Sequence, residues 1–170
     1  MKCSDIITQE ELENLNLVQL IERINTIPKT TIKELRFSDL YQPRNSCHGI
    51  YFIKSPQNII YIGTATKRCI ADRIGGHFDS RKGSFLNSFL KKVAEEETDE
   101  AMHCAFMNVL DWEFSVLFIE GNETQSLTKL TLFAEQLLIY YYTKHKQCLN
   151  GCRRKRPYSN IEFSLKDLIK

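Results

Sequence analysis

Apolar residues recur at helical spacing near the start of the chain and predict a helix over residues 8–25. Thr8 and Glu11 form a capping-box pattern at the start of this helix, and Pro28 follows its end. A similar pattern beginning at Thr31 predicts a second, shorter helix. This N-terminal part therefore reads as a helical layer.

Three segments predict β-strands instead. Residues 49–54 and 59–63 are β-rich and apolar on both faces, and the segment that joins them contains Pro56, which favours a turn. Residues 112–121 give the third strand. Because a strand that is apolar on both faces must be covered on both faces, we expect helices on either side of the sheet.

The remaining segments supply these helices. Helical patterns cover residues 64–74, 84–96 and 126–146, and a short helix is expected within residues 163–170, whereas residues 97–110 show no clear pattern. The order of the elements predicts an α+β fold, with a small, mostly antiparallel sheet between helical layers. A length of 170 residues indicates one domain with an N-terminal extension.

The composition is that of a globular protein: 42% of the residues are hydrophobic, 26% are charged, and the formal net charge is only +2. No segment reads as a signal peptide or a membrane span, so we expect a cytoplasmic protein, nucleoid-associated if bacterial, that does not enter a membrane. The basic residues are unevenly distributed, with six Lys or Arg and no acid between Lys144 and Arg156. Such segregation favours a surface that faces a polyanion, although a solvated tail would look the same.

The six cysteines are expected to be reduced thiols. Cys148 and Cys152 form the only close pair, and a zinc site that also used Cys47 and His48 is a less favoured alternative.

Three polar residues lie where their chemistry calls for an explanation. Glu135 has Leu132 one turn before it and Leu138 and Ile139 one turn after it, so its carboxylate sits on an apolar helix face and needs a cationic partner. An internal ion pair or a position at the rim of the core would also account for it. Arg73 and His77 share a face if their helix continues through Gly75 and Gly76, and an Arg beside a lone acid suits phosphate chemistry.

The triplets Gly49-Ile50-Tyr51 and Tyr61-Ile62-Gly63, separated by nine residues, resemble the motif of the GIY-YIG endonuclease superfamily. The resemblance continues in order through Arg73, His77, Glu135 and Asn150, and it covers about residues 48–151. It implies a three-stranded antiparallel sheet flanked by helices. It divides the chain into an N-terminal helical extension (1–45), a nuclease domain (46–152) and a basic tail with a short helix (153–170).

The resemblance also implies hydrolysis of DNA to 5′-phosphate and 3′-hydroxyl ends with one divalent metal ion. Glu135 would hold Mg²⁺ or Mn²⁺, and Arg73 would neutralise charge in the transition state. Tyr51 would orient the attacking water and act as general base if nearby positive charge lowered its pKa, whereas His77 is the rival base. Tyr61 would join the same cluster, and Asn150 would fix the geometry of the Glu or of the scissile strand.

Within this class a restriction-type or stand-alone endonuclease is favoured. The alternatives are a repair incision nuclease that acts on damaged or branched DNA with partner proteins, and a non-catalytic DNA-binding module on the same fold. We expect a monomer or homodimer. The residues expected to contact DNA are Lys67, Arg68, Arg81, Lys82, Arg153, Arg154, Lys155 and Arg156.

The spacing of the two phenols makes a geometric prediction. A two-residue turn at Pro56 and Gln57 would send Tyr51 and Tyr61 to opposite faces of the hairpin, because side chains alternate along a strand. If both phenols serve one site, the loop holds an odd number of residues or a bulge shifts the register. We predict that Tyr51 lies directly across from Tyr61.

Overall fold

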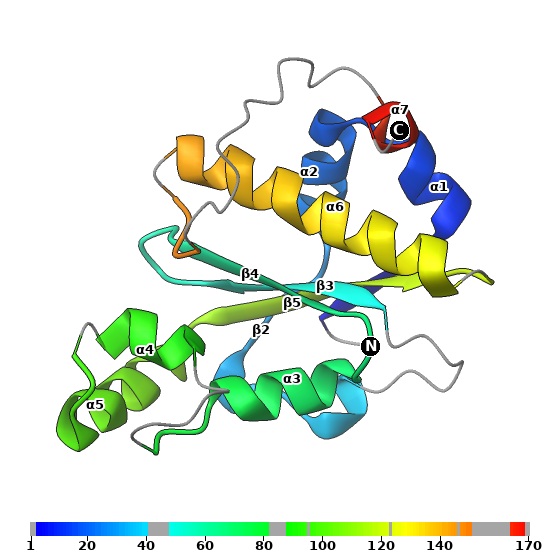
Figure 1. Ribbon diagram of the computed structural model, residues 1–170. Coiled ribbons are helices and arrows are strands. Elements are labelled where there is room, and N and C mark those ends of the chain that lie inside the picture. Colours follow the sequence, from blue (N-terminus) through cyan, green and yellow to red (C-terminus); the bar gives the residue numbers. More distant parts are fainter. Residues whose placement is uncertain are drawn as a thin grey trace.

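A central sheet lies between two layers of helices in the computed structural model (Figure 1). The structure describes residues 3–40, 48–81, 88–94, 96–122, 124–145, 147–150 and 164–168. Helices α1 (Gln9–Asn14), α2 (Leu17–Thr26), α6 (Thr124–Lys144) and α7 (Leu165–Leu168) cover one face of the sheet. Helices α3 (Ile70–His77), α4 (Ser88–Ala94) and α5 (Asp99–Val109) cover the other.

The sheet is mixed and has five strands: β1 (Ser4–Thr8), β2 (Thr30–Thr31), β3 (Gly49–Lys54), β4 (Ile60–Ala65) and β5 (Glu113–Glu120). Their order is β1-β5-β3-β4, and β2 also pairs with β5. The pairing of β1 with β5 is parallel, and the other pairings are antiparallel.

The α+β class is confirmed, but the prediction of a three-stranded antiparallel sheet is wrong. The three predicted strands are present as β3, β4 and β5 and are antiparallel to one another. The N-terminal segment, predicted to be helical only, contributes β1 and β2 to the same sheet.

The single helix predicted over residues 8–25 is also wrong, because it is broken between Asn14 and Leu17. The Thr8–Glu11 capping box does start α1. A second capping box starts α2, where the Asn16 side chain accepts a hydrogen bond from the Gln19 amide at 2.9 Å. Asn competes for backbone hydrogen bonds, so it favours the end of one helix and the start of the next over a helix interior.

The other elements follow the predictions with shifted boundaries. α3 starts at Ile70 rather than near residue 64, because β4 continues to Ala65. Only the 3₁₀ turn η1 (Ile32–Glu34) follows Thr31, and a second such turn, η2 (Phe37–Asp39), comes next. The segment 97–110, which showed no clear pattern, contains α5, and the Thr98 side chain caps this helix. No helix in the described part of the chain is long and apolar enough to cross a membrane.

Alternation along the strands divides the interior into two cores. Even-numbered residues of the hairpin, such as Ile50, Phe52 and Ile62, pack with α1, α2 and α6. Odd-numbered residues, such as Tyr51 and Tyr61, pack with α3, α4 and α5. The expectation that both faces of these strands are covered is therefore confirmed, and the two tyrosines belong to one core.

Candidate functional site

The β3–β4 turn sets the register of the two tyrosines. The Ser55 amide donates to the Ile59 carbonyl at 2.8 Å, so the loop between the paired ends holds Pro56, Gln57 and Asn58. Asn58 has a φ of 65°, as in the three-residue hairpin loops that end in a left-handed residue. The loop thus holds an odd number of residues, as the shared-face hypothesis required.

Both phenols therefore lie on one face, which confirms that part of the geometric prediction. The direct opposition of Tyr51 and Tyr61 is wrong, because Tyr51 pairs with Gly63 and Tyr61 pairs with Ile53. The two tyrosines are diagonal neighbours.

Gly63 lets the Tyr51 ring cross over β4. A Cβ atom added at Gly63 would lie 2.2 Å from both Cζ and the hydroxyl oxygen of Tyr51, closer than real Cβ contacts come. The phenol thus occupies the space that a side chain at this position would fill. The sequence marked Gly63 as part of a triplet, but this contact becomes visible only once the register is known.

The crossing phenol meets His77. The Tyr51 hydroxyl and His77 Nε2 are 2.5 Å apart, and a neutral imidazole accepts this hydrogen bond at Nε2. His77 reaches this position because α3 continues through Gly75 and Gly76, as the shared-face argument for Arg73 and His77 assumed. Both partners are inside the protein, with Tyr51 0% and His77 2% exposed.

Arg73 and Glu135 act on the same hydroxyl. The exposed Arg73 lies close enough to stabilise the Tyr51 phenolate by charge and by a hydrogen bond, and Glu135 is near enough to oppose it. Glu135 is half-buried on α6, from the helical layer across the sheet. Strand β3, helix α3 and helix α6 thus bring Tyr51, His77, Arg73 and Glu135 into one neighbourhood.

Burial decides the protonation of Tyr51. Loss of solvation raises the pKa of the Tyr51 phenol well above its ordinary value, Tyr61 raises it further, and Arg73 lowers it without outweighing burial. A general base of the kind considered for Tyr51 needs the opposite shift. The hydroxyl therefore stays protonated at neutral pH and serves as a hydrogen-bond donor.

Tyr61 joins the cluster through ring contacts. Its ring centroid lies 5.2 Å from that of His77, edge to face, and 5.0 Å from that of Phe89. The Tyr61 hydroxyl lies 3.5 Å from the Ser88 hydroxyl of α4, a contact that the sequence did not predict. Tyr61 and Phe89 therefore both pack against the imidazole of His77.

Asn150 lies on the edge of β4. Its side chain accepts a hydrogen bond from the Ile62 amide at 2.7 Å and donates one to the Ile62 carbonyl at 2.8 Å. Residues 147–150 run along this edge, since the Ile60 amide donates to the Gln147 carbonyl and the Leu149 amide donates to the Ile60 carbonyl. The described contacts of Asn150 thus fix this strip to the Tyr61-Ile62-Gly63 triplet.

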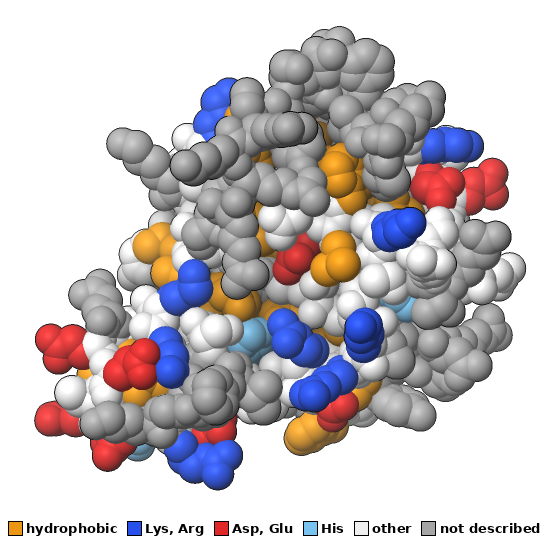
Figure 2. Space-filling model, viewed as in Figure 1, with side chains coloured by type: hydrophobic (Ala, Val, Ile, Leu, Met, Phe, Trp, Pro, Cys, Tyr) orange, Lys and Arg blue, Asp and Glu red, His pale blue; other side chains and the backbone are white. Residues whose placement is uncertain are grey.

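Basic side chains surround part of this region. Lys67 and Arg68 are exposed in the turn before α3, whereas the exposed Arg81 is held by Asp79 through bonds of 2.8 and 2.7 Å. Figure 2 shows Lys and Arg side chains gathered over α3, beside a His and near an acidic side chain with hydrophobic neighbours. The other residues expected to contact DNA, Lys82, Arg153, Arg154, Lys155 and Arg156, lie outside the described residues.

The residues of the zinc alternative are described only in part. His48 is buried, its Nε2 lies 2.9 Å from the Thr128 hydroxyl, and burial lowers its pKa. Cys47 and Cys152 lie outside the described residues. Among the residues that are described, no group of three His, Cys, Asp or Glu side chains is placed to hold a metal ion.

Comparison with known proteins adds no relative to this picture: no protein family, no curated protein and no solved structure matches the chain.

Proposed function

We propose that the protein is a metal-dependent DNA endonuclease whose site is built around Tyr51, His77, Arg73 and Glu135. The observation that carries the proposal is the Tyr51–His77 hydrogen bond of 2.5 Å, with Arg73 and Glu135 both acting on the same hydroxyl. Four residues that the GIY-YIG resemblance selects, from distant parts of the chain, are neighbours.

Glu135 is the residue proposed to hold Mg²⁺ or Mn²⁺. Mg²⁺ usually keeps several waters and binds through one or two carboxylates together with substrate phosphates, so a single half-buried carboxylate suits it. A cage of several protein ligands is not required. An ion held there would supply positive charge for the leaving oxygen and for one phosphate oxygen.

Arg73 and Glu135 are the proposed catalytic residues, because both reach the surface of the cluster. The Arg73 guanidinium would bind a phosphate oxygen and neutralise the charge that develops during hydrolysis. Tyr51 and His77 are buried beneath it, so we assign them as positioning residues. Their hydrogen bond fixes the phenol, and the phenol orients Arg73.

DNA is the proposed substrate because the exposed Lys67 and Arg68 extend the positive surface away from Arg73. A restriction-type or stand-alone enzyme, monomeric or homodimeric, remains the favoured role within this proposal. Repair incision and non-catalytic DNA binding are outcomes that the experiment distinguishes.

The test is a cleavage assay with supercoiled plasmid and with flap, bulged and damaged duplexes, in Mg²⁺ or Mn²⁺. Arg73→Ala and Glu135→Gln are expected to lower the cleavage rate about 100- to 1,000-fold, as the loss of one transition-state contact does. DNA affinity, measured in EDTA, should change far less, because these contacts act mainly on the transition state. Arg36→Ala and Glu10→Gln, exposed positions outside the cluster, are the matched controls.

Cleavage of plasmid by the wild type would favour the stand-alone role, and cleavage confined to flap, bulged or damaged duplexes would favour repair incision. DNA binding without cleavage of any substrate would reject the enzyme in favour of a binding module. Cleavage by Glu135→Gln at the wild-type rate would reject the proposed site.

A further inference from the structure

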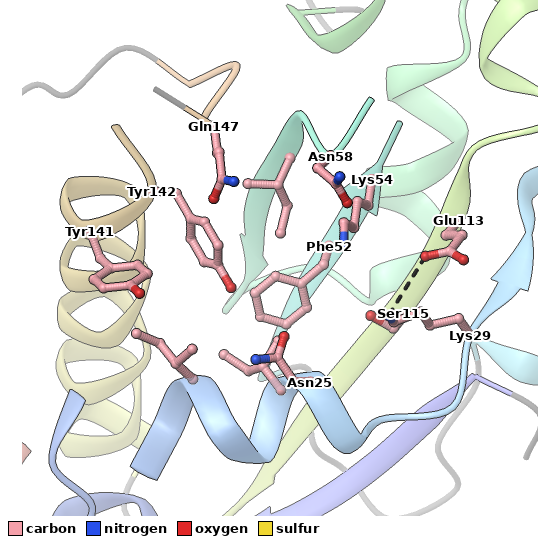
Figure 3. Close-up of a pocket in the computed structure, with 13 residues that line it drawn as sticks. Asn25, Lys29, Phe52, Lys54, Asn58, Glu113, Ser115, Tyr141, Tyr142 and Gln147 are labelled. Atoms are coloured by element: carbon pink, nitrogen blue, oxygen red, sulfur yellow. Dashed lines mark ion pairs between the residues drawn. The ribbon is translucent and has the colours of Figure 1, made fainter. Parts of the chain in front are cut away.

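A cavity of ≈ 230 Å³ opens on the other face of the sheet from Tyr51 (Figure 3). It lies between α2, the end of α6 and the turn end of the hairpin, and Phe52 forms its floor. Tyr51 and Phe52 are adjacent in β3 and point to opposite faces. The cavity is therefore separate from the proposed nuclease site.

Ser115 contributes a hydroxyl to the wall of this cavity. Ser115 lies on β5 opposite Phe52, lines the cavity, and is only 5% exposed. Its hydroxyl makes no hydrogen bond to any other side chain or backbone group in the described part of the chain. The hydroxyl therefore has hydrogen-bonding capacity that a polar ligand group in the cavity could use.

Tyr142 supplies a second hydroxyl. It comes from the last turns of α6, and Figure 3 shows its ring beside Phe52 with the hydroxyl directed into the cavity. Burial raises the pKa of Tyr142, so this hydroxyl keeps its proton and can donate. The wall thus combines an aromatic face with a fixed donor.

Three carboxamides stand around the same space. Asn25, Asn58 and Gln147 come from α2, the hairpin turn and the strip after α6, and none of their side chains is hydrogen-bonded to another described residue. A carboxamide presents a donor and an acceptor side by side, which matches the edge of a nucleobase. Aromatic rings such as Phe52 and Tyr142 stack on the flat faces of bases.

The mouth of the cavity carries a positive balance. Lys29 Nζ lies 3.7 Å from Glu113 Oε2, and Lys54 is the cross-strand neighbour of the same glutamate. The two ammonium groups outnumber the single carboxylate of Glu113 among the residues that line the cavity, so an anionic group there would be attracted.

We propose that this cavity binds a nucleotide, with the base against Phe52 and Tyr142 and the phosphate near Lys29 and Lys54. The size of the cavity limits what enters: drug-sized ligands occupy about 300–1,000 Å³, and the ≈ 230 Å³ here suits a single base with its phosphate outside. The ligand is a free nucleotide or one nucleotide of a single strand. This inference does not rest on the proposed nuclease activity.

Isothermal titration calorimetry of the full chain in EDTA tests the proposal, because without divalent metal the nuclease function does not enter. The probes are the ribo- and deoxyribonucleoside monophosphates, the matching nucleosides, inorganic phosphate and a short single-stranded oligodeoxynucleotide. Stronger binding of the monophosphates than of the oligodeoxynucleotide would identify a free nucleotide as the ligand, and the reverse order would identify a strand. Either result supports the site.

Four variants locate the binding. Ser115→Val, which replaces the hydroxyl by a methyl group and narrows the cavity with a second one, should weaken binding at least tenfold. Tyr142→Phe should weaken it about threefold to tenfold, the range for one neutral hydrogen bond. Lys54→Met should weaken the binding of the monophosphates but not the binding of the nucleosides. Lys129→Met, an exposed site on α6 outside the cavity, is the control and should change nothing.

Two results would overturn the proposal. One is the absence of binding by every nucleotide and oligonucleotide at millimolar concentration. The other is binding that Ser115→Val and Tyr142→Phe leave unchanged, which would place the ligand elsewhere. Because Tyr142→Phe keeps the ring in place, the test survives even if Ser115→Val fails to fold.

Discussion

Gly63→Ala tests the central contact of the candidate site, the crossing of the Tyr51 ring over β4. The new methyl group would lie 2.2 Å from Cζ and from the hydroxyl oxygen of Tyr51. The phenol cannot yield toward solvent, since Tyr51 is 0% exposed and its hydroxyl is bonded to His77. The substitution therefore displaces the ring and breaks the hydrogen bond.

The expected cost is a net loss of about 1–4 kcal/mol in the free energy of unfolding. Overpacking a filled core costs about 1–3 kcal/mol, and the lost hydrogen bond adds about 0.5–1.5 kcal/mol. Replacing Gly by Ala also makes the unfolded chain less flexible, which returns about 0.4–1 kcal/mol. For a chain of this size the melting temperature should fall by roughly 2–16 °C.

Chemical denaturation monitored by circular dichroism measures this change, and two comparisons isolate its cause. Gly75→Ala adds a methyl group on α3 where no atom lies within 4 Å apart from its chain neighbours and the backbone of its own helix, so it should stabilise the protein by up to about 1 kcal/mol. In a Tyr51→Leu background the far ring atoms are gone, so Gly63→Ala should cost little. An equal cost of Gly63→Ala with and without the Tyr51 ring would refute the reasoning.

Two further predictions concern the strip beside β4 and the N-terminal strand. Asn150→Ala removes both hydrogen bonds to Ile62 and is expected to lower the free energy of unfolding by about 1–3 kcal/mol. Hydrogen exchange of the Ile62 amide should become faster, and unchanged protection of this amide would contradict the stabilising role of the two bonds. Burial raises the pKa of Cys3 from 9.0 to about 11, so the folded state keeps a proton that the unfolded chain releases. Stability should hold below pH 9 and fall as the pH rises toward 11, and Cys3→Ala should lessen that fall in thermal melts; an identical decline in both proteins would assign it to other groups.

The parts of the fold with strong local patterns could be predicted from the sequence. The strands β3 and β5 are apolar runs of ordinary strand length, and α6 repeats apolar residues over several turns. Their secondary structure can therefore be assigned without knowing which distant segments they contact. The strand β1 was missed because it has five residues and only Ile6 and Ile7 are apolar. Its partner β5 lies far along the chain, and such a pairing leaves no local signal.

The candidate site was predictable as a set of residues and not as an arrangement. The resemblance selected Tyr51, Arg73, His77 and Glu135, and these are neighbours in the structure. The protonation of Tyr51 depends on how deeply the ring is buried and on how near Arg73 comes, and neither follows from spacing in the sequence. The sequence argument made a general-base role for Tyr51 depend on nearby positive charge that lowers the pKa of the phenol, but burial, which raises that pKa, has the larger effect.

The alternation of β3 explains how one hairpin can serve two separate sites. Tyr51 points to the core that contains His77, and Phe52 points to the other core, where it forms the floor of the cavity. Their cross-strand partners lie on the same two faces. Gly63, opposite Tyr51, leaves room for the phenol, and Ser115, opposite Phe52, lines the cavity. A shift of one residue in the register would exchange these faces, and a two-residue turn would have made that shift. The three-residue loop that ends at Asn58 is thus the local feature on which both proposed sites depend.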